Sequence, residues 1–258
     1  MTINNVREDW YSQHRKKIMD HFKIAKPLSN RVKKYQSPTG KYTVVVTPVE
    51  FRFRNKKTKY IYTIGTVYQD GKMIFNVHRN APDFPYLFVE DHEDGFDYLL
   101  CAEDNQARTV VQLNTSKARS FISEKSQRGI EFCWQKLHTS ENAKVIAVEG
   151  YVKHKPKDKL EYREIRFYKF SDIMDLPWKE IGERINFPYE EFISWENDSH
   201  YTLAIHEEVR YTDDMKVTDL TQAERKNSLL KDEIRLKKIF YKFPLQEGIR
   251  EEVYSEWI

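Results

Sequence analysis

The sequence predicts an all-β fold with minor helices, built from antiparallel strand-turn-strand repeats. Three observations favour this class. Aromatic residues make up 14% of the chain, and large flat side chains pack well across neighbouring strands. Tight-turn sequences recur, and each leads into a run rich in β-branched and aromatic residues. With only 8 Gly and 9 Pro, the composition argues against a low-complexity or fibrous protein.

The N-terminal segment 1–30 is expected to form a helix followed by a linker. Tyr11, Ile18 and Phe22 stand near helical spacing, and Pro27 ends the pattern. We expect this helix to cover the edge of a sheet. The alternative is a basic amphipathic face at residues 15–17, which would suit nucleic acid or a membrane surface.

Residues 31–258 are expected to form a single propeller-like β domain made of a repeated cassette. Each copy begins with a turn whose Asp-Gly or Pro-x-Gly sequence, or Asn-containing equivalent, favours a tight reversal. A strand that pairs back on its neighbour follows each turn. The sequence predicts these strands at 42–46, 73–77, 98–101, 145–148 and 201–205.

Two further kinds of strand complete the repeat. An aromatic strand precedes the turn, and we expect it at 86–88, 132–134 and 192–195. An outer strand follows, and we expect it at 108–113, 164–170 and 233–243. The chain then holds three to four units of roughly 45 to 55 residues, a period in the range of propeller blades. Open meander sheets satisfy the same pattern.

A helical insertion is expected near 218–237. Thr221-Gln-Ala-Glu224 fits a capping box, in which the Thr and Glu side chains satisfy backbone amides at the helix start. Leu220, Ala223, Leu230 and Ile234 approximate one apolar stripe. We expect this stripe to pack onto a sheet, and docking of a partner helix is the alternative.

One turn supports a resemblance to a known family. Ser37-Pro-Thr-Gly-Lys41 and the β run after it resemble the S-P-D-G-K hairpin of WD40-like and TolB-like propeller repeats. Residues 138–148 are similar in shape, and 163–172 resemble the outer strand and exit turn of such a blade. The resemblance covers roughly residues 36–206 and implies propeller blades, although the Trp-Asp and Gly-His pairs of WD40 unit ends are missing. Residues 84–104 also resemble part of a family of uncharacterised proteins, which implies no activity.

Cysteine usage and hydropathy favour a cytoplasmic location. Cys101 and Cys133 stand in apolar strand-like contexts, typical of buried free thiols. The N-terminus lacks a basic region followed by an apolar region, so export is not expected. No window approaches the roughly 18 consecutive apolar residues of a membrane span. We therefore expect no contact with a membrane.

An acidic stretch is the first candidate site. Between Asn80 and Ala107 there are eight acids and no Lys or Arg. Carboxylates gathered at a loop suit Mg²⁺, Mn²⁺ or Ca²⁺, and a nearby His could move a proton. The spacing is not that of an EF-hand, and strand alternation sends neighbouring side chains to opposite faces. A solvated acidic hairpin is therefore the alternative. The candidate metal ligands are Asp91, His92, Asp94, Asp97 and His78.

The favoured function is a protein-interaction or scaffold module on a propeller-like fold. The sequence holds no G-x-S-x-G, H-E-x-x-H, Walker or G-x-G-x-x-G motif, so catalysis is not favoured, no catalytic residue is assigned and no cofactor is expected. The alternative is a metal-dependent hydrolase that uses the acidic hairpin 90–104. The partner-binding candidates are Glu90, Glu103, Asp104, Trp134 and Trp195.

Nucleic-acid binding is the second alternative function. Basic residues alternate with Phe51, Phe53 and Tyr60, which could give a cationic hairpin on which bases stack. The same pattern also describes an exposed strand edge whose charges discourage aggregation. The nucleic-acid candidates are Arg52, Arg54, Lys56 and Lys57.

Overall fold

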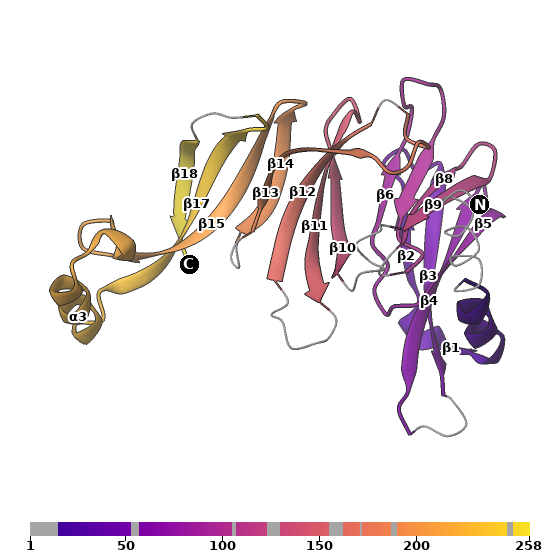
Figure 1. Cartoon of the computed structure of the whole chain (residues 1–258), viewed down its shortest axis with the longest axis horizontal. Helices are drawn as coiled ribbons and strands as arrows, with labels where there is room; N and C mark the ends of the chain where they lie inside the picture. Colours follow the sequence, from indigo (N-terminus) through magenta and orange to yellow (C-terminus); the bar gives the residue numbers. More distant parts are fainter. Residues whose placement is uncertain are drawn as a thin grey trace, which may run out of the picture. The chain divides into compact units, whose positions relative to one another are not determined.

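The computed structural model describes residues 15–52, 57–104, 107–122, 130–154, 162–170, 172–186, 190–246 and 250–258. Most of these residues lie in four antiparallel sheets (Figure 1). The prediction of an all-β fold with minor helices is confirmed. We number the sheets 1 to 4 in chain order.

Sheet 1 has the strand order β1-β3-β4-β5, and β2 also pairs with β3. A tight reversal at Asp70-Gly71 joins β4 to β5, and both of its residues have positive φ (50° and 76°). Such angles match a hairpin turn that follows the twist of the strands. The elements are β1 (Lys26–Pro27), η1 (Ser29–Arg31), β2 (Lys33–Gln36), β3 (Tyr42–Phe51), β4 (Tyr60–Gln69) and β5 (Lys72–Arg79).

Sheets 2, 3 and 4 are meanders whose main strands follow the chain order. Sheet 2 contains β6 (Tyr86–Val89), β7 (Tyr98–Cys101), β8 (Ala107–Gln112) and β9 (Lys117–Ile122). Sheet 3 contains β10 (Ile130–Thr139), β11 (Val145–His154), β12 (Tyr162–Lys169) and β13 (Lys179–Ile185). Sheet 4 contains β14 (Glu190–Asn197), β15 (His200–Arg210), β17 (Ile234–Pro244) and β18 (Glu251–Trp257), and β16 (Met215–Lys216) pairs with β15.

Each expected strand overlaps an observed one, but several observed strands are longer: the run expected at 42–46 belongs to β3 (Tyr42–Phe51), and the run expected at 145–148 belongs to β11 (Val145–His154). The run 98–101 is β7, and the outer strand expected at 233–243 is β17. Sheets 2, 3 and 4 each hold the predicted order of aromatic, apolar and outer strands. Sheet 1 holds only the predicted strands that follow a turn. The propeller resemblance itself stays a prediction.

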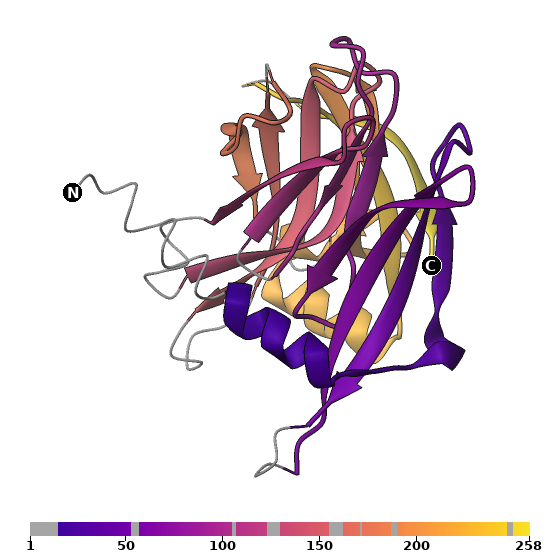
Figure 2. The same ribbon diagram turned by 90° about the vertical axis from the view of Figure 1, so that its right-hand side faces the viewer.

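The N-terminal helix packs on a face of sheet 1 rather than on its edge (Figure 2). Residues 15–24 are helical, and residues 1–14 of the expected segment lie outside the described residues. The Phe22 ring lies 5.4 Å from Tyr62 and 4.8 Å from His78. These contacts bury the apolar side of the helix against sheet 1. Removing this aromatic surface from water stabilises the fold.

The late helix is shorter than expected. It is α3 (Gln222–Leu230), and Thr221 and Glu224 form the predicted capping box. The expected stripe continued to Ile234, but that residue begins β17, which pairs with β15 over eleven residue pairs. Sheet pairing thus takes precedence over helical spacing there. Within the described residues, no helix is both long and apolar enough to cross a membrane.

The described residues form two compact units, each with its own core. Unit 1 comprises 1–137, 150–161 and 170–179, and unit 2 comprises 138–149, 162–169 and 180–258. The core of unit 1 joins sheets 1 and 2, with Tyr42, Val44 and Val67 packed against Leu99 and Val111. The core of unit 2 joins sheets 3 and 4 around Phe167 and Tyr201. The expected single domain 31–258 stays a prediction.

Candidate functional site

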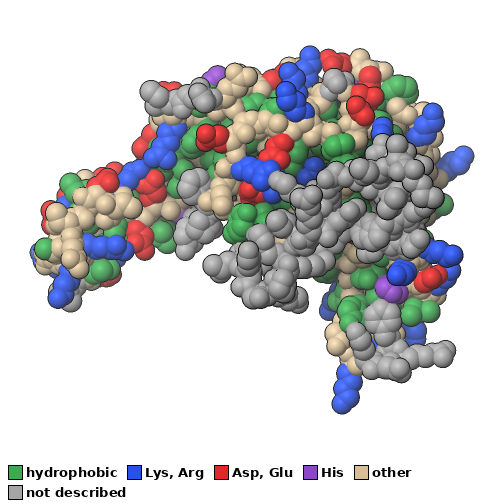
Figure 3. All heavy atoms as spheres, in the orientation of Figure 1, with side chains coloured by type: hydrophobic (Ala, Val, Ile, Leu, Met, Phe, Trp, Pro, Cys, Tyr) green, Lys and Arg blue, Asp and Glu red, His purple; other side chains and the backbone are tan. Residues whose placement is uncertain are grey.

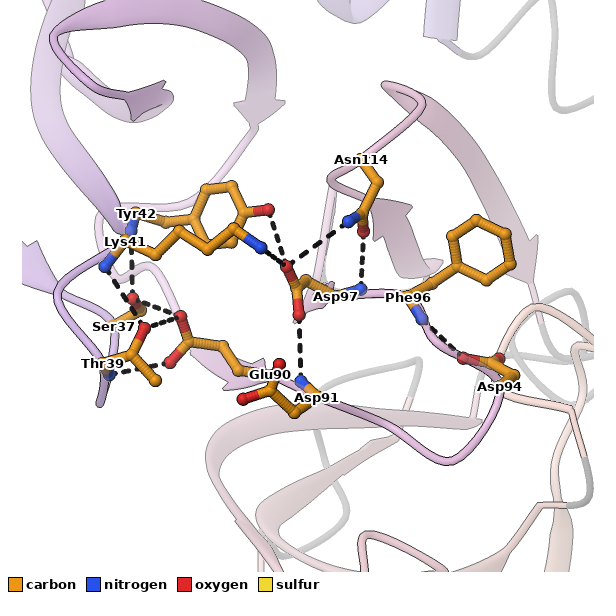
Figure 4. Close-up of polar contacts among 10 residues, drawn as sticks. All are labelled: Ser37, Thr39, Lys41, Tyr42, Glu90, Asp91, Asp94, Phe96, Asp97 and Asn114. Carbon is orange, nitrogen blue, oxygen red and sulfur yellow. Dashed lines mark hydrogen bonds and ion pairs between the residues drawn. The ribbon is translucent and has the colours of Figure 1, made fainter.

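Glu90, at the start of the acidic hairpin, ties sheet 2 to the turn before β3 (Figure 4). Its carboxylate accepts hydrogen bonds from the Ser37 hydroxyl at 2.8 Å, the Thr39 hydroxyl at 2.5 Å and the Thr39 amide at 2.9 Å. These donors are neutral and come from one turn. Glu90 therefore fixes the Ser37-Pro-Thr-Gly-Lys41 hairpin and is not a free partner-binding carboxylate.

Asp97 is the centre of the same polar network (Figure 4). Its buried carboxylate accepts from Lys41 Nζ at 2.5 Å, the Tyr42 hydroxyl at 2.8 Å and the Asp91 amide at 2.9 Å. Burial favours a raised pKa, but these hydrogen bonds outweigh it and lower the pKa of Asp97. The hydrogen bond to Asp97 raises the pKa of Lys41 to about 12. The charge at Asp97 is thus compensated inside the protein.

Asp94 and His92 form a second local cluster. Asp94 accepts hydrogen bonds from the Tyr98 hydroxyl at 2.6 Å and the Phe96 amide at 3.0 Å. Burial favours a raised pKa for Asp94, but the bonds from Tyr98, the Phe96 amide and His92 outweigh it and lower the pKa. His92 is buried, with its Nδ1 3.1 Å from Asp94 Oδ1. Both side chains stabilise the hairpin.

The expected metal ligands do not assemble into a metal site. Asp97 faces Lys41, Asp94 faces Tyr98, and the Asp91 residue is exposed. His78 packs under Phe22, and burial lowers its pKa. Among the residues that the structure describes, no group of three or more His, Cys, Asp or Glu could hold a metal ion. The hydrolase alternative therefore lacks an assembled set of ligands in this part of the chain.

The two remaining acidic partner candidates are buried. Glu103 forms an ion pair with Arg15 at 2.7 Å and accepts a hydrogen bond from the Ser120 hydroxyl at 3.0 Å. Asp104 accepts from the Ala107 amide at 2.7 Å. A carboxylate that is removed from water needs such compensation. Both residues are almost fully buried and their carboxylates are compensated within the protein, so neither presents a free carboxylate at the surface.

The two tryptophan candidates also pack inside the protein. Trp134 is 2% exposed and stacks on Trp178 with ring centroids 5.8 Å apart. Trp195 is half-buried and donates its indole N–H to the His138 carbonyl at 3.0 Å. Tryptophan is amphipathic, and a sequence does not show whether its ring faces a core or a partner. The structure places Trp134 in a core, and it holds Trp195 largely there.

The nucleic-acid candidates form no continuous basic face in the described residues. Arg52 and Lys57 are exposed, whereas Arg54 and Lys56 lie outside the described residues. Close by, Lys59 pairs with Glu50 at 2.8 Å. In unit 2, Figure 3 shows Lys and Arg side chains interspersed with Asp and Glu side chains over α3 and the adjoining ends of β15 and β17. Mixed charge of this kind gives little electrostatic attraction to a polyanion.

A groove on unit 1 offers a surface with binding chemistry. Its volume is about 530 Å³, within the range of roughly 300–1,000 Å³ that is typical of ligand pockets. Side chains of β3 and β4 form one part, and the connection between β5 and β6 forms another. The lining residues are Arg31, Lys33, Tyr35, Val46, Pro48, Ile61, Pro82, Asp83, Phe84, Pro85 and Gln135.

Strand register explains why apolar side chains line this groove. Val46 pairs with Gly65, Pro48 with Thr63, and Lys33 with Val46. Since alternate residues share a face, these positions continue the core face of sheet 1. The core covers part of this face of sheet 1. The apolar side chains beyond the core form one side of the groove.

Phe84 depends on a glycine opposite it. A Cβ added at Gly65 would lie 2.2 Å from Phe84 Cζ, which is closer than atoms can pack. The ring therefore rests on the bare backbone of β4. Such close approach is a recurrent reason for glycine within a strand.

A buried arginine anchors the same connection. Arg79 is 0% exposed and donates to the backbone carbonyls of Asp83 at 2.7 Å, Ala102 at 2.9 Å and Asp104 at 3.0 Å. Its guanidinium also pairs with the Asp83 carboxylate at 3.0 Å. A planar group with five donors suits several acceptors at once. Arg79 therefore holds the segment that carries Pro82, Phe84 and Pro85.

Sequence reasoning missed this groove and its anchor. The available signal was the run Pro82-Asp-Phe-Pro85 between two strands, together with Pro48 inside a strand, since proline is rare in a paired strand. Which aromatic residues meet Pro48 depends on sheet register and on the path of the connection. A linear pattern does not contain that information.

Two cavities on unit 2 combine charges of both signs. The cavity of about 550 Å³ is lined by Lys216, Arg225 and Arg250, but also by Glu207, Glu208 and Asp219. Lys216 pairs with Glu207 at 2.7 Å, and this pair neutralises part of the lining. The second cavity, of about 660 Å³, lies beside Tyr201 and Phe243. The second lining also contains apolar residues, but its charged residues among those described are one acid, Glu183, and one base, Arg250, so it lacks the excess of cations of the groove of unit 1.

No protein-family model, curated protein or solved structure matches this chain.

Proposed function

We propose that this chain is a protein-interaction module that uses the groove of unit 1 to bind a segment of a partner protein. The groove is the observation that carries the proposal. Tyr35, Pro48 and Phe84 supply aromatic and apolar surface beside the cations Arg31 and Lys33. Binding pockets commonly combine an apolar lining with a few polar groups that orient the ligand.

The rigidity of the groove supports this role. Arg79 fixes the Asp83 backbone, and the neighbouring Pro82 and Pro85 have restricted φ angles. A surface that is ordered before binding loses less conformational entropy when a ligand arrives. A scaffold of repeated antiparallel sheets, arranged as propeller-like blades, would present this surface to a partner.

A cytoplasmic location is part of the proposal. Cys101 and Cys133 are both buried, and neither forms a disulfide. Thiols that stay reduced are usual in the cytoplasm, where disulfides are rare.

Selection of peptides from a displayed random library on the purified full chain tests the proposal. Ile61→Glu places a charge in the groove, and Thr66→Glu makes the same kind of change on the opposite face of the same strand. We expect selected peptides to bind the wild type and Thr66→Glu, and to bind Ile61→Glu at least about tenfold more weakly, which corresponds to 1.4 kcal/mol.

Circular dichroism and thermal unfolding would establish that both variants are folded. Selected peptides that bind Ile61→Glu as tightly as the wild type would contradict the groove as the binding surface. A library that yields no binding peptide would contradict the interaction module in this form.

A further inference from the structure

The charges around the groove of unit 1 are asymmetric. Arg31 and Lys33 are exposed, and neither side chain donates a hydrogen bond to another described side chain. Lys59 and, to a smaller extent, Arg31 lower the pKa of Glu50, so Arg31 also acts on that carboxylate. Among the described residues of the lining, Asp83 is the one acid, and the buried Arg79 guanidinium pairs with it. The charged side chains of the lining therefore present a net positive charge to a ligand.

The apolar lining imposes a second requirement. Val46, Pro48 and Ile61 carry no polar side-chain atoms, and the tip of the Phe84 ring lies against Gly65. A ligand gains free energy here by burying apolar side chains against this surface and removing them from water. A purely charged ligand would leave this surface exposed.

The size of the groove limits what can bind. A volume of about 530 Å³ accommodates a few side chains of an extended segment and not a folded domain. Two cations also offer few contacts to a nucleic acid, because strong binding of that class commonly neutralises roughly six to ten phosphates. The observations therefore favour a short peptide over a polynucleotide.

We propose that the groove selects an acidic peptide segment, with apolar side chains against Val46, Pro48 and Ile61 and carboxylates beside Arg31 and Lys33. This inference rests on the proposed function and specifies the chemistry of the partner. The charges on the protein and on the peptide are complementary, which gives selectivity as well as a faster encounter.

Strand alternation provides a matched pair of variants. Lys33 and Lys34 are adjacent in β2, and both are exposed. Lys33 lines the groove, whereas Lys34 is directed to the other face of the sheet. Lys33→Glu and Lys34→Glu change the net charge equally, so they separate a local contact from the overall charge of the chain.

The experiment repeats the library selection with the wild type, Lys34→Glu and the double variant Arg31→Glu/Lys33→Glu. We expect acidic residues beside apolar ones to be enriched on the first two proteins and basic residues on the double variant. One fluorescently labelled peptide from the wild-type selection should bind Lys33→Glu about tenfold more weakly in anisotropy titrations, with Lys34→Glu near the wild-type value. Its affinity should also fall as salt concentration rises.

The outcomes distinguish the two proposals. Peptides that compete for the groove but show no acidic preference, or the same preference on the double variant, would overturn the acidic specificity while the interaction module stands. Peptides whose binding is indifferent to Ile61→Glu would overturn both. Tighter binding of a labelled single-stranded oligonucleotide than of any selected peptide, with loss in Arg31→Glu/Lys33→Glu, would assign the groove to nucleic acid instead.

Discussion

The Lys41 ammonium, beside β3, lies 2.5 Å from the Asp97 carboxylate that precedes β7. The Tyr42 hydroxyl donates to the same oxygen at 2.8 Å. This contact links the first two sheets of unit 1 at a position where Asp97 is almost fully buried. In the sequence, the acidic hairpin resembles a ligand site. In the structure, it holds the two sheets together.

Asp97→Asn should lower the free energy of unfolding by about 1–3 kcal/mol, because it removes the charge that Lys41, Tyr42 and the Asp91 amide compensate. Urea denaturation monitored by fluorescence measures the change. The control is Asp91→Asn in the same hairpin, where the side chain is exposed and the backbone φ of 52° suits asparagine. Equal effects of the two substitutions would contradict the role assigned to Asp97.

The unfolding free energy should fall as the pH decreases below about 4. The pKa values of Asp97 and Asp94 both lie below the ordinary value of 3.8, since their hydrogen bonds outweigh the effect of burial. The unfolded chain then binds protons first, so this stabilisation is present above the unfolded pKa and disappears as the pH falls through the folded pKa. Denaturation between pH 2 and pH 6 should show a smaller acid-side loss in Asp97→Asn than in the wild type. Identical pH dependences would disagree with this assignment.

Arg79→Lys should destabilise the protein by about 3 kcal/mol or more, although it keeps the positive charge. Lysine cannot reproduce the planar set of donors, so buried carbonyls of Asp83, Ala102 and Asp104 lose partners. Chemical denaturation provides the measurement. Arg119→Lys is the matched control, because that side chain is 54% exposed and surface substitutions usually stay within about 0.5 kcal/mol. A change at Arg79 no larger than the change at Arg119 would refute the anchoring role.

Gly65→Ala should reduce stability by about 1–3 kcal/mol. Alanine would ordinarily be favoured over glycine inside a strand by roughly 0.5–1 kcal/mol. Whether Gly65→Ala stabilises or destabilises the protein therefore depends on Phe84. The new methyl group would overlap the Phe84 ring, and the displaced ring would also alter the groove. Thermal unfolding and peptide titration measure the two effects, with Thr66→Ala on the opposite face as control. A stabilised Gly65→Ala would show that the ring moves away without cost.

Addition of Mg²⁺, Mn²⁺, Ca²⁺ or Zn²⁺ should leave the Tm unchanged. Asp97 and Asp94 already accept hydrogen bonds from Lys41, Tyr42 and Tyr98. A metal bound to the native state at a hundred times its Kd would stabilise the fold by about 2.7 kcal/mol, which a thermal-shift assay detects. A metal-dependent rise that Asp91→Asn/Asp94→Asn abolishes would restore the hairpin as a metal site.

Much of the β architecture could be predicted from local pattern. Asp70-Gly71 favours a tight reversal whatever surrounds it, and β7 coincides with the expected run 98–101. The capping box at Thr221 and Glu224 likewise formed as predicted, since the contact lies within one turn of helix. The end of that helix was predicted too late, because β15 pairs with the residues from Ile234 onward and such pairing is not local.

The sequence by itself determined the fold class, the turns and most of the strands, because these follow from backbone preferences and side-chain period over a few residues. Only the tertiary structure decided what the chemical groups do. Glu103 and Trp134 look available in the sequence and are buried, whereas Lys33, Pro48 and Phe84 meet in a groove. Sheet register and long-range packing bring such residues together or bury them, and the spacing of residues along the chain does not specify those contacts.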